Sequence, residues 1–215
     1  MNKYIFLDFN GTVLDDIDLC LNLLNDMLYD KEKKTVTLEE YKNIFDFPII
    51  NYYIAAGFTF SGYTFEELAD VFVVDYARRS KTETTIFSDL EEFVALVKEL
   101  GYKVVICSAS LKPMLLDQLK HAGILELFDD VIALDNHFAA SKLELAKKYV
   151  SEENIDLDNS YFVGDTTHDA EVAYACGIKP ILVDRGHQSK EVLCKSKSVI
   201  LGSLLETANY LKNKR

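Results

Sequence analysis

Short apolar runs alternate with segments of helical periodicity along most of the chain. The runs predicted to be buried strands are residues 3–9, 102–107, 131–134, 161–163 and 180–183. Each run is short and mostly apolar, and helix-like segments separate the runs from one another. Strands buried on both faces and joined through helices are typical of a parallel sheet that is covered on both sides. The pattern therefore predicts an α/β protein with a doubly wound, Rossmann-like core.

Helices are predicted where apolar residues recur at intervals of three and four. Residues 90–100 carry such a stripe and end before Gly101, which is a typical C-terminal stop. Pro113 suits the first turn of the next helix, after an expected loop at residues 108–112. A further helix is expected to begin at Ser141, and another carries small residues between 167 and 176.

Residues 16–81 follow a different pattern, because every apolar stripe in them has a helical period. A simple crossover between two parallel strands is not expected to hold so long an all-helical stretch. We therefore expect an inserted all-helical cap subdomain. The predicted domains are an α/β core of residues 1–15 and 82–215, and a helical cap of residues 16–81.

Composition narrows the classes of partner. The chain has 215 residues with 35 acidic against 23 basic, a net charge of -12, and no basic cluster that would offset it. Binding to nucleic acid or to an anionic membrane is therefore disfavoured. Four cysteines form no CxxC pair. The opening apolar stretch lacks the apolar h-region and the cleavage site of a signal peptide, and no run reaches about 20 apolar residues, so neither a signal peptide nor a membrane span is expected. We expect a cytoplasmic protein, either a monomer or a homodimer.

Polar side chains follow the predicted strands. Asp8 ends the first strand, Ser108 ends the second, Lys142 opens the helix after the third, and Asp165 and Asp169 follow the fourth. Alone, each has an ordinary explanation as a helix cap, a turn residue or a solvated charge. In a doubly wound sheet, however, all of them lie at one rim. Clustered carboxylates repel one another unless a cation lies among them, and hard oxygen ligands favour Mg²⁺.

The phrases DFNGTV, ICSAS, SKLELAKKY and GDTTHD, in this order, resemble the haloacid dehalogenase (HAD) superfamily of phosphotransferases and phosphatases. The stretch IFDFPIINYYIAAGF, and GDTTHDAEVAYACGI followed by GHQS, are similar to its phosphoglycolate-phosphatase-like branch, which has a helical cap. The resemblance covers nearly the whole chain. It implies a Mg²⁺-dependent phosphatase that acts on a small phosphorylated metabolite held between core and cap.

The resemblance also implies catalytic and phosphate-binding residues. Asp8 would be the nucleophile that forms an aspartyl-phosphate, and Lys142 would neutralise the charge between it and the phosphate. This agrees with elementary electrostatics, because a dianionic phosphate approaches a carboxylate only where positive charge offsets the repulsion. Asn10 and Ser108 complete the expected catalytic set. The expected phosphate-binding residues are Gly11, Thr12, Ser108, Ala109 and Lys142.

The metal ligands implied by the resemblance come from two of the four phrases, DFNGTV and GDTTHD. Asp8 and Asp165 would bind Mg²⁺ through carboxylate oxygens, and Asn10 through its backbone carbonyl. Asp169 would hold either the water shell of the metal or Lys142. The metal set is thus Asp8, Asn10, Asp165 and Asp169.

Asn10 departs from the family pattern, which has at this position a second aspartate that protonates the leaving group and later activates water. General acid–base assistance is typically worth about 10²–10⁴-fold in rate. Three explanations are open. The substrates have leaving groups that need little protonation, as in acyl phosphates or anhydrides, or another acid takes the role of the missing aspartate, with Asp15, Asp16 and His168 as candidates. In the third, the protein keeps the fold for phosphate binding or regulation and has little turnover.

Two other reactions and several further residues stay open at this stage. A sugar-phosphate mutase is an alternative, although it would rely on the missing aspartate, and dehalogenation would leave the magnesium and phosphate residues idle. Arg78 and Arg79 either reach a second anionic group of the substrate or form a solvated helix face. His187 lies in a loop that either borders the site or forms a structural turn.

Overall fold

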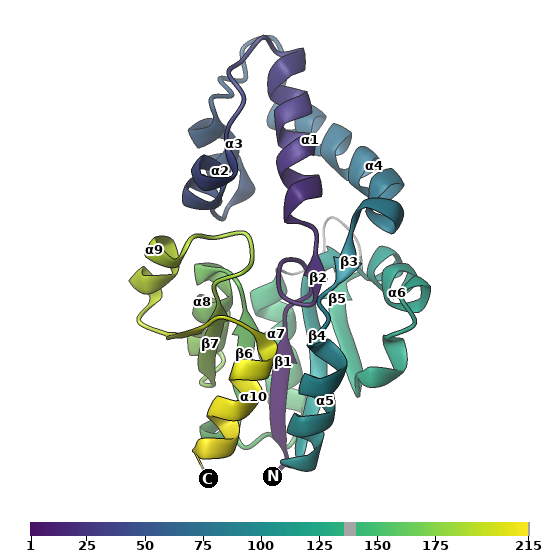
Figure 1. The fold of residues 1–215 in the computed structure, drawn as a ribbon, viewed down its shortest axis with the longest axis vertical. Helices are drawn as coiled ribbons and strands as arrows, with labels where there is room; N and C mark the ends of the chain where they lie inside the picture. The colour runs from purple at the N-terminus through teal and green to yellow at the C-terminus, as the bar shows by residue number, and fades with distance from the viewer. Residues whose placement is uncertain (136–140, 215) are drawn as a thin grey trace.

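The computed structural model describes residues 1–135 and 141–214, and its centre is a six-stranded parallel sheet (Figure 1). The strand order is β5-β4-β1-β6-β7-β8. The strands are β1 (Lys3–Leu7), β4 (Tyr102–Leu111), β5 (Asp130–Leu134), β6 (Tyr161–Gly164), β7 (Lys179–Val183) and β8 (Val199–Leu201). The predicted doubly wound α/β fold is thereby confirmed.

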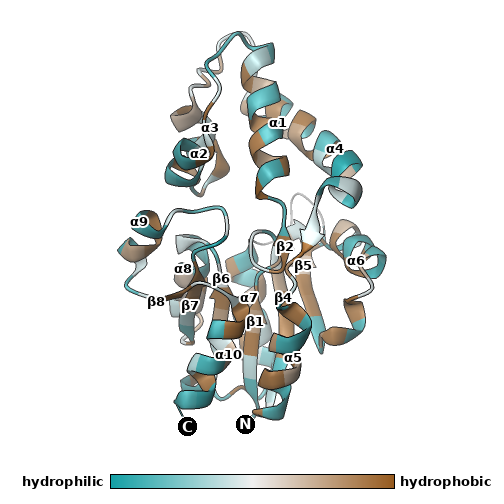
Figure 2. Cartoon of the chain, viewed as in Figure 1, coloured by the Kyte–Doolittle hydropathy of each residue, from teal (hydrophilic) through white to brown (hydrophobic). Residues whose placement is uncertain are grey.

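Helices cover both faces of this sheet. The core helices are α5 (Leu90–Glu99), α6 (Lys112–His121), α7 (Lys142–Glu152), α8 (Thr167–Ala175), α9 (Lys190–Leu193) and α10 (Leu204–Asn213). Alternate residues of β1 point to opposite faces. Ile5 and Leu7 pack with α5, α6 and α10, whereas Tyr4 and Phe6 pack with α7 and α8. Figure 2 shows the resulting contrast between mostly brown strands and helices striped with teal.

Capping residues position the helices that border the site. The Ser141 hydroxyl accepts the backbone N–H of Glu144, and the Glu144 carboxylate accepts that of Ser141, so a capping box begins α7 at Lys142. A second capping box, between Thr166 and Asp169, begins α8. Both helices therefore start at the carboxyl ends of the parallel strands.

Four helices lie together beyond that edge of the sheet, at the top of Figure 1. They are α1 (Ile17–Asp30), α2 (Leu38–Ile44), α3 (Ile49–Ala56) and α4 (Phe65–Glu83), and they share a hydrophobic core of their own. Two short antiparallel strands, β2 (Leu14–Asp15) and β3 (Thr85–Ile86), carry the chain into and out of these helices. The insertion is all-helical, as expected, and the exact boundary at 16–81 stays a prediction. No helix in the described part of the chain is long and apolar enough to span a bilayer.

One expectation about the sheet was wrong. Residues 108–112 do not form a loop, because β4 continues to Leu111 before α6 begins at Lys112. Its pairing with β5 is interrupted between Cys107 and Leu111, and pairing resumes between Leu111 and Leu134. An irregular strand end is well suited to hold Ser108 at the site, since it changes the direction in which side chains point.

Candidate active site

The residues that follow the strands meet in one cavity between the sheet and the four inserted helices. The cavity has a volume of about 390 Å³. Asp8, Ser108, Lys142, Asp165 and Asp169 all line it. Carboxylate oxygens of the three aspartates lie within 4.8 Å of one another. The structure thus brings together the side chains expected at one rim, and their chemical roles stay predictions.

Lys142 joins two of these carboxylates. Its ammonium group contacts Oδ1 of Asp8 and lies 2.6 Å from Oδ1 of Asp169. The ammonium also lies over the ring of Phe162, 5.0 Å from its centroid. Burial alone would lower the pKa of Lys142, but Asp169 and Asp8 outweigh it and raise that pKa. The lysine is therefore a fixed cation at the bottom of the cavity.

One lysine does not balance three buried carboxylates. Burial, together with repulsion from Asp169 and Asp165, raises the pKa of Asp8 to about 8 although Lys142 acts in the opposite direction. Burial raises the pKa of Asp165 to about 6, with Asp169 adding to the effect. Burial would also raise the pKa of Asp169, yet contact with Lys142 lowers it. This excess of negative charge on oxygen ligands fits a divalent cation such as Mg²⁺.

Gly11 and Thr12 lie against Asp165. The Thr12 hydroxyl donates to Oδ1 of Asp165 at 2.9 Å, and the backbone N–H of His187 donates to Oδ2 at 2.7 Å. Gly11 has a φ of 71°, and a Cβ placed there would lie 2.3 Å from Oδ2 of Asp165. Unlike Ser108 and Ala109, neither residue is among the described side chains that line the cavity. Their expected contact with phosphate stays a prediction.

Replacement of Gly11 tests how tightly this turn is packed against Asp165. We expect Gly11→Ala to lower kcat/KM by roughly 10²-fold, since displacement of a site group by about 1 Å has that effect. Gly123→Ala is the matched control, because Gly123 has a φ of 72° and open space around it. The control should lose only about 1–2 kcal/mol in the free energy of unfolding, the usual cost of a Cβ in the left-handed region. Equal activity of the two variants would show that contact with Asp165 is unimportant.

Asn10 uses every polar atom of its side chain. Its Nδ2 donates to Oδ2 of Asp16 at 2.8 Å and to the Tyr76 hydroxyl at 2.7 Å. Its Oδ1 accepts the hydroxyl of Ser110 at 3.1 Å. An aspartate at this position would place a second acceptor, instead of the amide donor, next to Oδ2 of Asp16, whose neighbouring Tyr76 hydroxyl has one proton to donate. The amide of Asn10 is therefore matched to a neighbouring acid.

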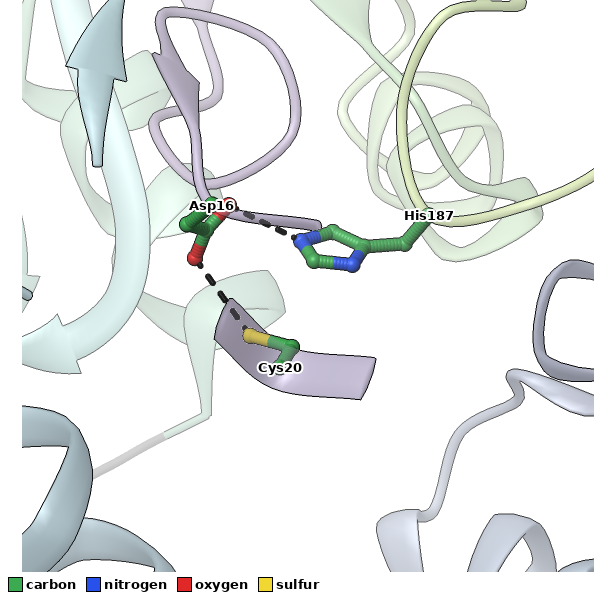
Figure 3. Close-up of side chains that lie close together, drawn as sticks. All are labelled: Asp16, Cys20 and His187. Carbon is green, nitrogen blue, oxygen red and sulfur yellow. Dashed lines mark hydrogen bonds and ion pairs between the residues drawn. The ribbon is translucent and has the colours of Figure 1, made fainter. Parts of the chain in front are cut away.

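That neighbour, Asp16, is the centre of a buried hydrogen-bonded cluster (Figure 3). Its Oδ1 accepts the Gly11 N–H at 3.0 Å and lies 3.1 Å from Nε2 of His187. Its Oδ2 accepts Asn10 and the Tyr76 hydroxyl, the latter at 2.8 Å, and Sγ of Cys20 lies 3.6 Å away. Its side chain makes no capping bond to α1, although Asp16 occupies the N-cap position.

The donors around Asp16 decide its ionisation. Burial would raise its pKa, but His187 and the hydrogen bonds from Asn10 and Tyr76 outweigh burial and lower it. Burial would lower the pKa of His187, yet Asp16 raises it to about 9. Asp16, Cys20 and His187 are close enough to hold a metal. Each oxygen of the Asp16 carboxylate already has at least two hydrogen-bond partners, whereas each oxygen of Asp165 has one, so the trio is better described as a hydrogen-bonded cluster.

The other residues considered as a replacement acid, or as a site for a second anionic group of the substrate, do not cluster around Asn10. Asp15 lies in β2 and is not among the described residues lining the cavity, whereas His168 does line it. The His168 ring stacks on that of Phe47, with centroids 4.9 Å apart. Arg78 pairs with Asp75, and Arg79 pairs with Glu83 and Asp26, outside the cavity.

Sequence reasoning missed the groups that the inserted helices contribute. Tyr76 of α4 reaches Asn10 and Asp16, and the Tyr41 hydroxyl of α2 lies 2.8 Å from Nδ1 of His187. Both tyrosines belong to apolar helical stripes, so the pattern indicates only burial. The available signal is that a buried tyrosine hydroxyl needs a polar partner.

The loop after β7 holds α2 against the core. The Ser189 N–H donates to the carbonyl of Lys42 at 3.0 Å, and the Gln188 side chain donates to the carbonyl of Phe45 at 2.8 Å. Residues of α2 and of α4 thus border the cavity on two sides.

The fold and the site together define a doubly wound α/β protein in which inserted helices lie over a lysine and three aspartates at the strand ends. The sequence pattern of the haloacid dehalogenase-like hydrolases matches residues 4–183. Since this range is more than half of the 215 residues, the chain belongs to that family. The family resemblance read from the four phrases is confirmed.

Solved structures share the fold over nearly the whole chain. A haloacid dehalogenase-like family hydrolase from Streptococcus pneumoniae has a TM-score of 0.81 at 16% identity, covering 97% of this chain and 98% of that one. A predicted phosphoglycolate phosphatase from Haemophilus somnus has a TM-score of 0.76 at 16% identity, covering 100% and 98%. At such identities the likeness establishes the fold alone.

A curated relative carries a different activity in its name. The tyrosine-protein kinase PtkA of Mycobacterium tuberculosis is 21% identical over 141 residues, which are 65% of this chain and 48% of PtkA. Its solved structure has a TM-score of 0.80 at 19% identity, covering 98% of each chain. This chain spans about half the length of the curated relatives that it matches.

Proposed function

We propose that the protein is a Mg²⁺-dependent phosphatase that hydrolyses a small phosphorylated metabolite through an aspartyl-phosphate at Asp8. The observation that carries the proposal is the buried Asp8 carboxylate, held by Lys142 beside Asp165 and Asp169 in the cavity between the sheet and the inserted helices. Asp8, the backbone carbonyl of Asn10 and Asp165 would hold Mg²⁺. When bound, the metal supplies positive charge that lets a phosphate dianion approach the carboxylate.

The chain's own residues account for the covalent steps. A carboxylate oxygen of Asp8 attacks phosphorus while the bond to the leaving oxygen breaks, and that oxygen takes the electron pair. Ser108 and Lys142 bind the phosphoryl oxygens. Water then attacks phosphorus, the bond to Asp8 breaks, and the carboxylate is restored. Division into two displacements lowers each barrier.

Removal of divalent cations tests the metal requirement. We expect chelator-treated protein to lose at least about 10²-fold in kcat, because a metal contributes several kcal/mol of charge stabilisation. Added Mg²⁺ should restore the rate. Calorimetry should also show Mg²⁺ binding that Asp165→Asn weakens, a readout that does not depend on turnover. Full activity in the presence of a chelator would contradict the proposed metal site.

A phosphate-binding or regulatory protein with low turnover is the second candidate. The observation that favours it is the side chain of Asn10, which has no acidic proton to transfer to a leaving group and whose polar atoms all have hydrogen-bond partners. A sugar-phosphate mutase would depend still more on that proton transfer. Turnover of a phosphate monoester well above the rate of Asp8→Asn would separate the phosphatase from the binding protein.

A further inference from the structure

The two ends of the cavity differ in chemistry. Beside the sheet it presents Asp8, Lys142 and Asp165. The inserted segment contributes mainly aromatic side chains to the other end, among them Phe45, Tyr52, Tyr53, Phe65, Phe72 and Tyr76. The ring of Phe72 stacks on that of Tyr76, with centroids 5.8 Å apart and planes 16° apart. An aromatic wall therefore begins directly beside Asn10, to which Tyr76 is hydrogen-bonded.

The aromatic end offers no free cation for a second anionic group. Among the described residues that line the cavity, Lys142 is the one lysine or arginine, and it is paired with Asp8 and Asp169. His187 also lines the cavity, but its two ring nitrogens already have Asp16 and the Tyr41 hydroxyl as partners. Nδ1 of His168 lies 3.2 Å from the carboxylate of Glu171. Burial of a carboxylate or a second phosphate without a counter-charge is strongly unfavourable. The group attached to the phosphate should accordingly be uncharged.

Asn10 restricts the leaving group independently of the cavity wall. An amide side chain does not protonate a departing oxygen, and Asp16 beside it accepts hydrogen bonds instead of donating one. A phenol has a pKa of about 10, against about 15.7 for water and similar values for simple alcohols. A phenoxide therefore leaves with far less need for a proton than an alkoxide.

From these two observations we infer that the substrate is the phosphate monoester of a phenol or a similar flat, uncharged aromatic hydroxyl compound. The inference rests on the proposed hydrolysis at Asp8. In the first step the Asp8 oxygen bonds to phosphorus and the aryl oxygen leaves with the electron pair. In the second, water replaces Asp8; one of its protons stays on the phosphate and the other goes to the phenoxide through solvent. The products are a phenol and inorganic phosphate.

Four phosphates separate binding of the ring from the quality of the leaving group, with Mg²⁺ present throughout. Phenyl phosphate has both a ring and a good leaving group, whereas benzyl phosphate has a ring but releases an alkoxide. Acetyl phosphate has a good leaving group without a ring, and ethyl phosphate has neither. We expect the highest kcat/KM for phenyl phosphate. Benzyl phosphate should have a similar KM with kcat lower by at least about 10²-fold, and acetyl phosphate a KM roughly tenfold higher.

The results with these phosphates separate a wrong substrate class from a wrong assignment as a phosphatase. Preference for ethyl phosphate or 2-phosphoglycolate over phenyl phosphate would overturn the aromatic substrate and leave the phosphatase standing. A KM for acetyl phosphate at or below that for phenyl phosphate would do the same. Hydrolysis of none of them would overturn both.

A variant of the aromatic wall tests the same inference without relying on a comparison of leaving groups. Phe72→Leu should raise the KM for phenyl and benzyl phosphates by roughly tenfold while the KM for acetyl phosphate stays unchanged. The control is Phe60→Leu, since Phe60 packs among cap aromatics such as Phe65 but is not among the described residues lining the cavity. Equal changes in KM for all three phosphates with Phe72→Leu would contradict a wall that recognises the ring.

Discussion

Asp8→Asn is expected to lower kcat for phenyl phosphate by at least about 10⁴-fold while the fold is retained. The asparagine keeps the shape of the side chain but lacks the carboxylate that would attack phosphorus. The contact of Lys142 with Asp169 remains, so the lysine keeps a buried partner. Steady-state kinetics measures the loss, and a thermal melt followed by circular dichroism checks that the protein is folded.

The matched control for this prediction is Asp15→Asn. It removes a carboxylate from the same N-terminal segment, but Asp15 lies in β2, outside the described lining of the cavity. We expect its kcat to stay within a few-fold of the unaltered protein. If Asp8→Asn kept its activity, another group would have to be the nucleophile. If both variants lost activity alike, a general effect of charge or stability would be responsible.

The sheet was predictable from sequence because its strands are buried on both faces. Continuous apolar runs identified β1, β4, β5, β6 and β7, and their order with intervening helices indicated the doubly wound topology. The sixth strand, β8, has three partly buried residues, and β2 and β3 have two residues each. Such short strands carry too few positions for a period to appear, and tertiary contacts decide them.

The site residues also fall into a group that the sequence could predict and a group that it could not. Asp8, Ser108, Lys142, Asp165 and Asp169 were predictable because the carboxyl ends of parallel strands meet at one edge. Because each of these residues follows a strand of the sheet, the sequence predicts that they lie close together in space. The contact between Asn10 and Tyr76 joins residues 66 positions apart on different structural units. No local pattern encodes how inserted helices close over a sheet, so the hydroxyl of Tyr76 could be predicted to be buried but not to have this partner.

Because Asp16 lies next to Asn10, restoring the missing aspartate with Asn10→Asp requires a second change at Asp16. A single Asn10→Asp change would place two carboxylates where a hydrogen bond of 2.8 Å now joins Asn10 to Asp16. Like charges about 4 Å apart repel by roughly 4 kcal/mol at an effective dielectric constant of 20. We therefore expect the single variant to be less stable than the unaltered protein. We also expect one proton to be shared between the two carboxyl groups instead of being available to a leaving group.

The exchange variant Asn10→Asp with Asp16→Asn is expected to raise kcat/KM for benzyl phosphate by about 10²–10⁴-fold, the usual contribution of a general acid. It keeps the net charge, and it keeps an amide donor and a carboxylate acceptor facing each other. The value of kcat/KM reports the first displacement and not the later attack of water, so kcat/KM for phenyl phosphate should change by less than about tenfold, because a phenoxide gains little from protonation. Asp16→Asn alone is the control and should accelerate neither substrate. Parallel kinetics on the two phosphates measure the difference, and an equal acceleration of both would mean that proton transfer to the leaving group is not the step that Asn10 limits.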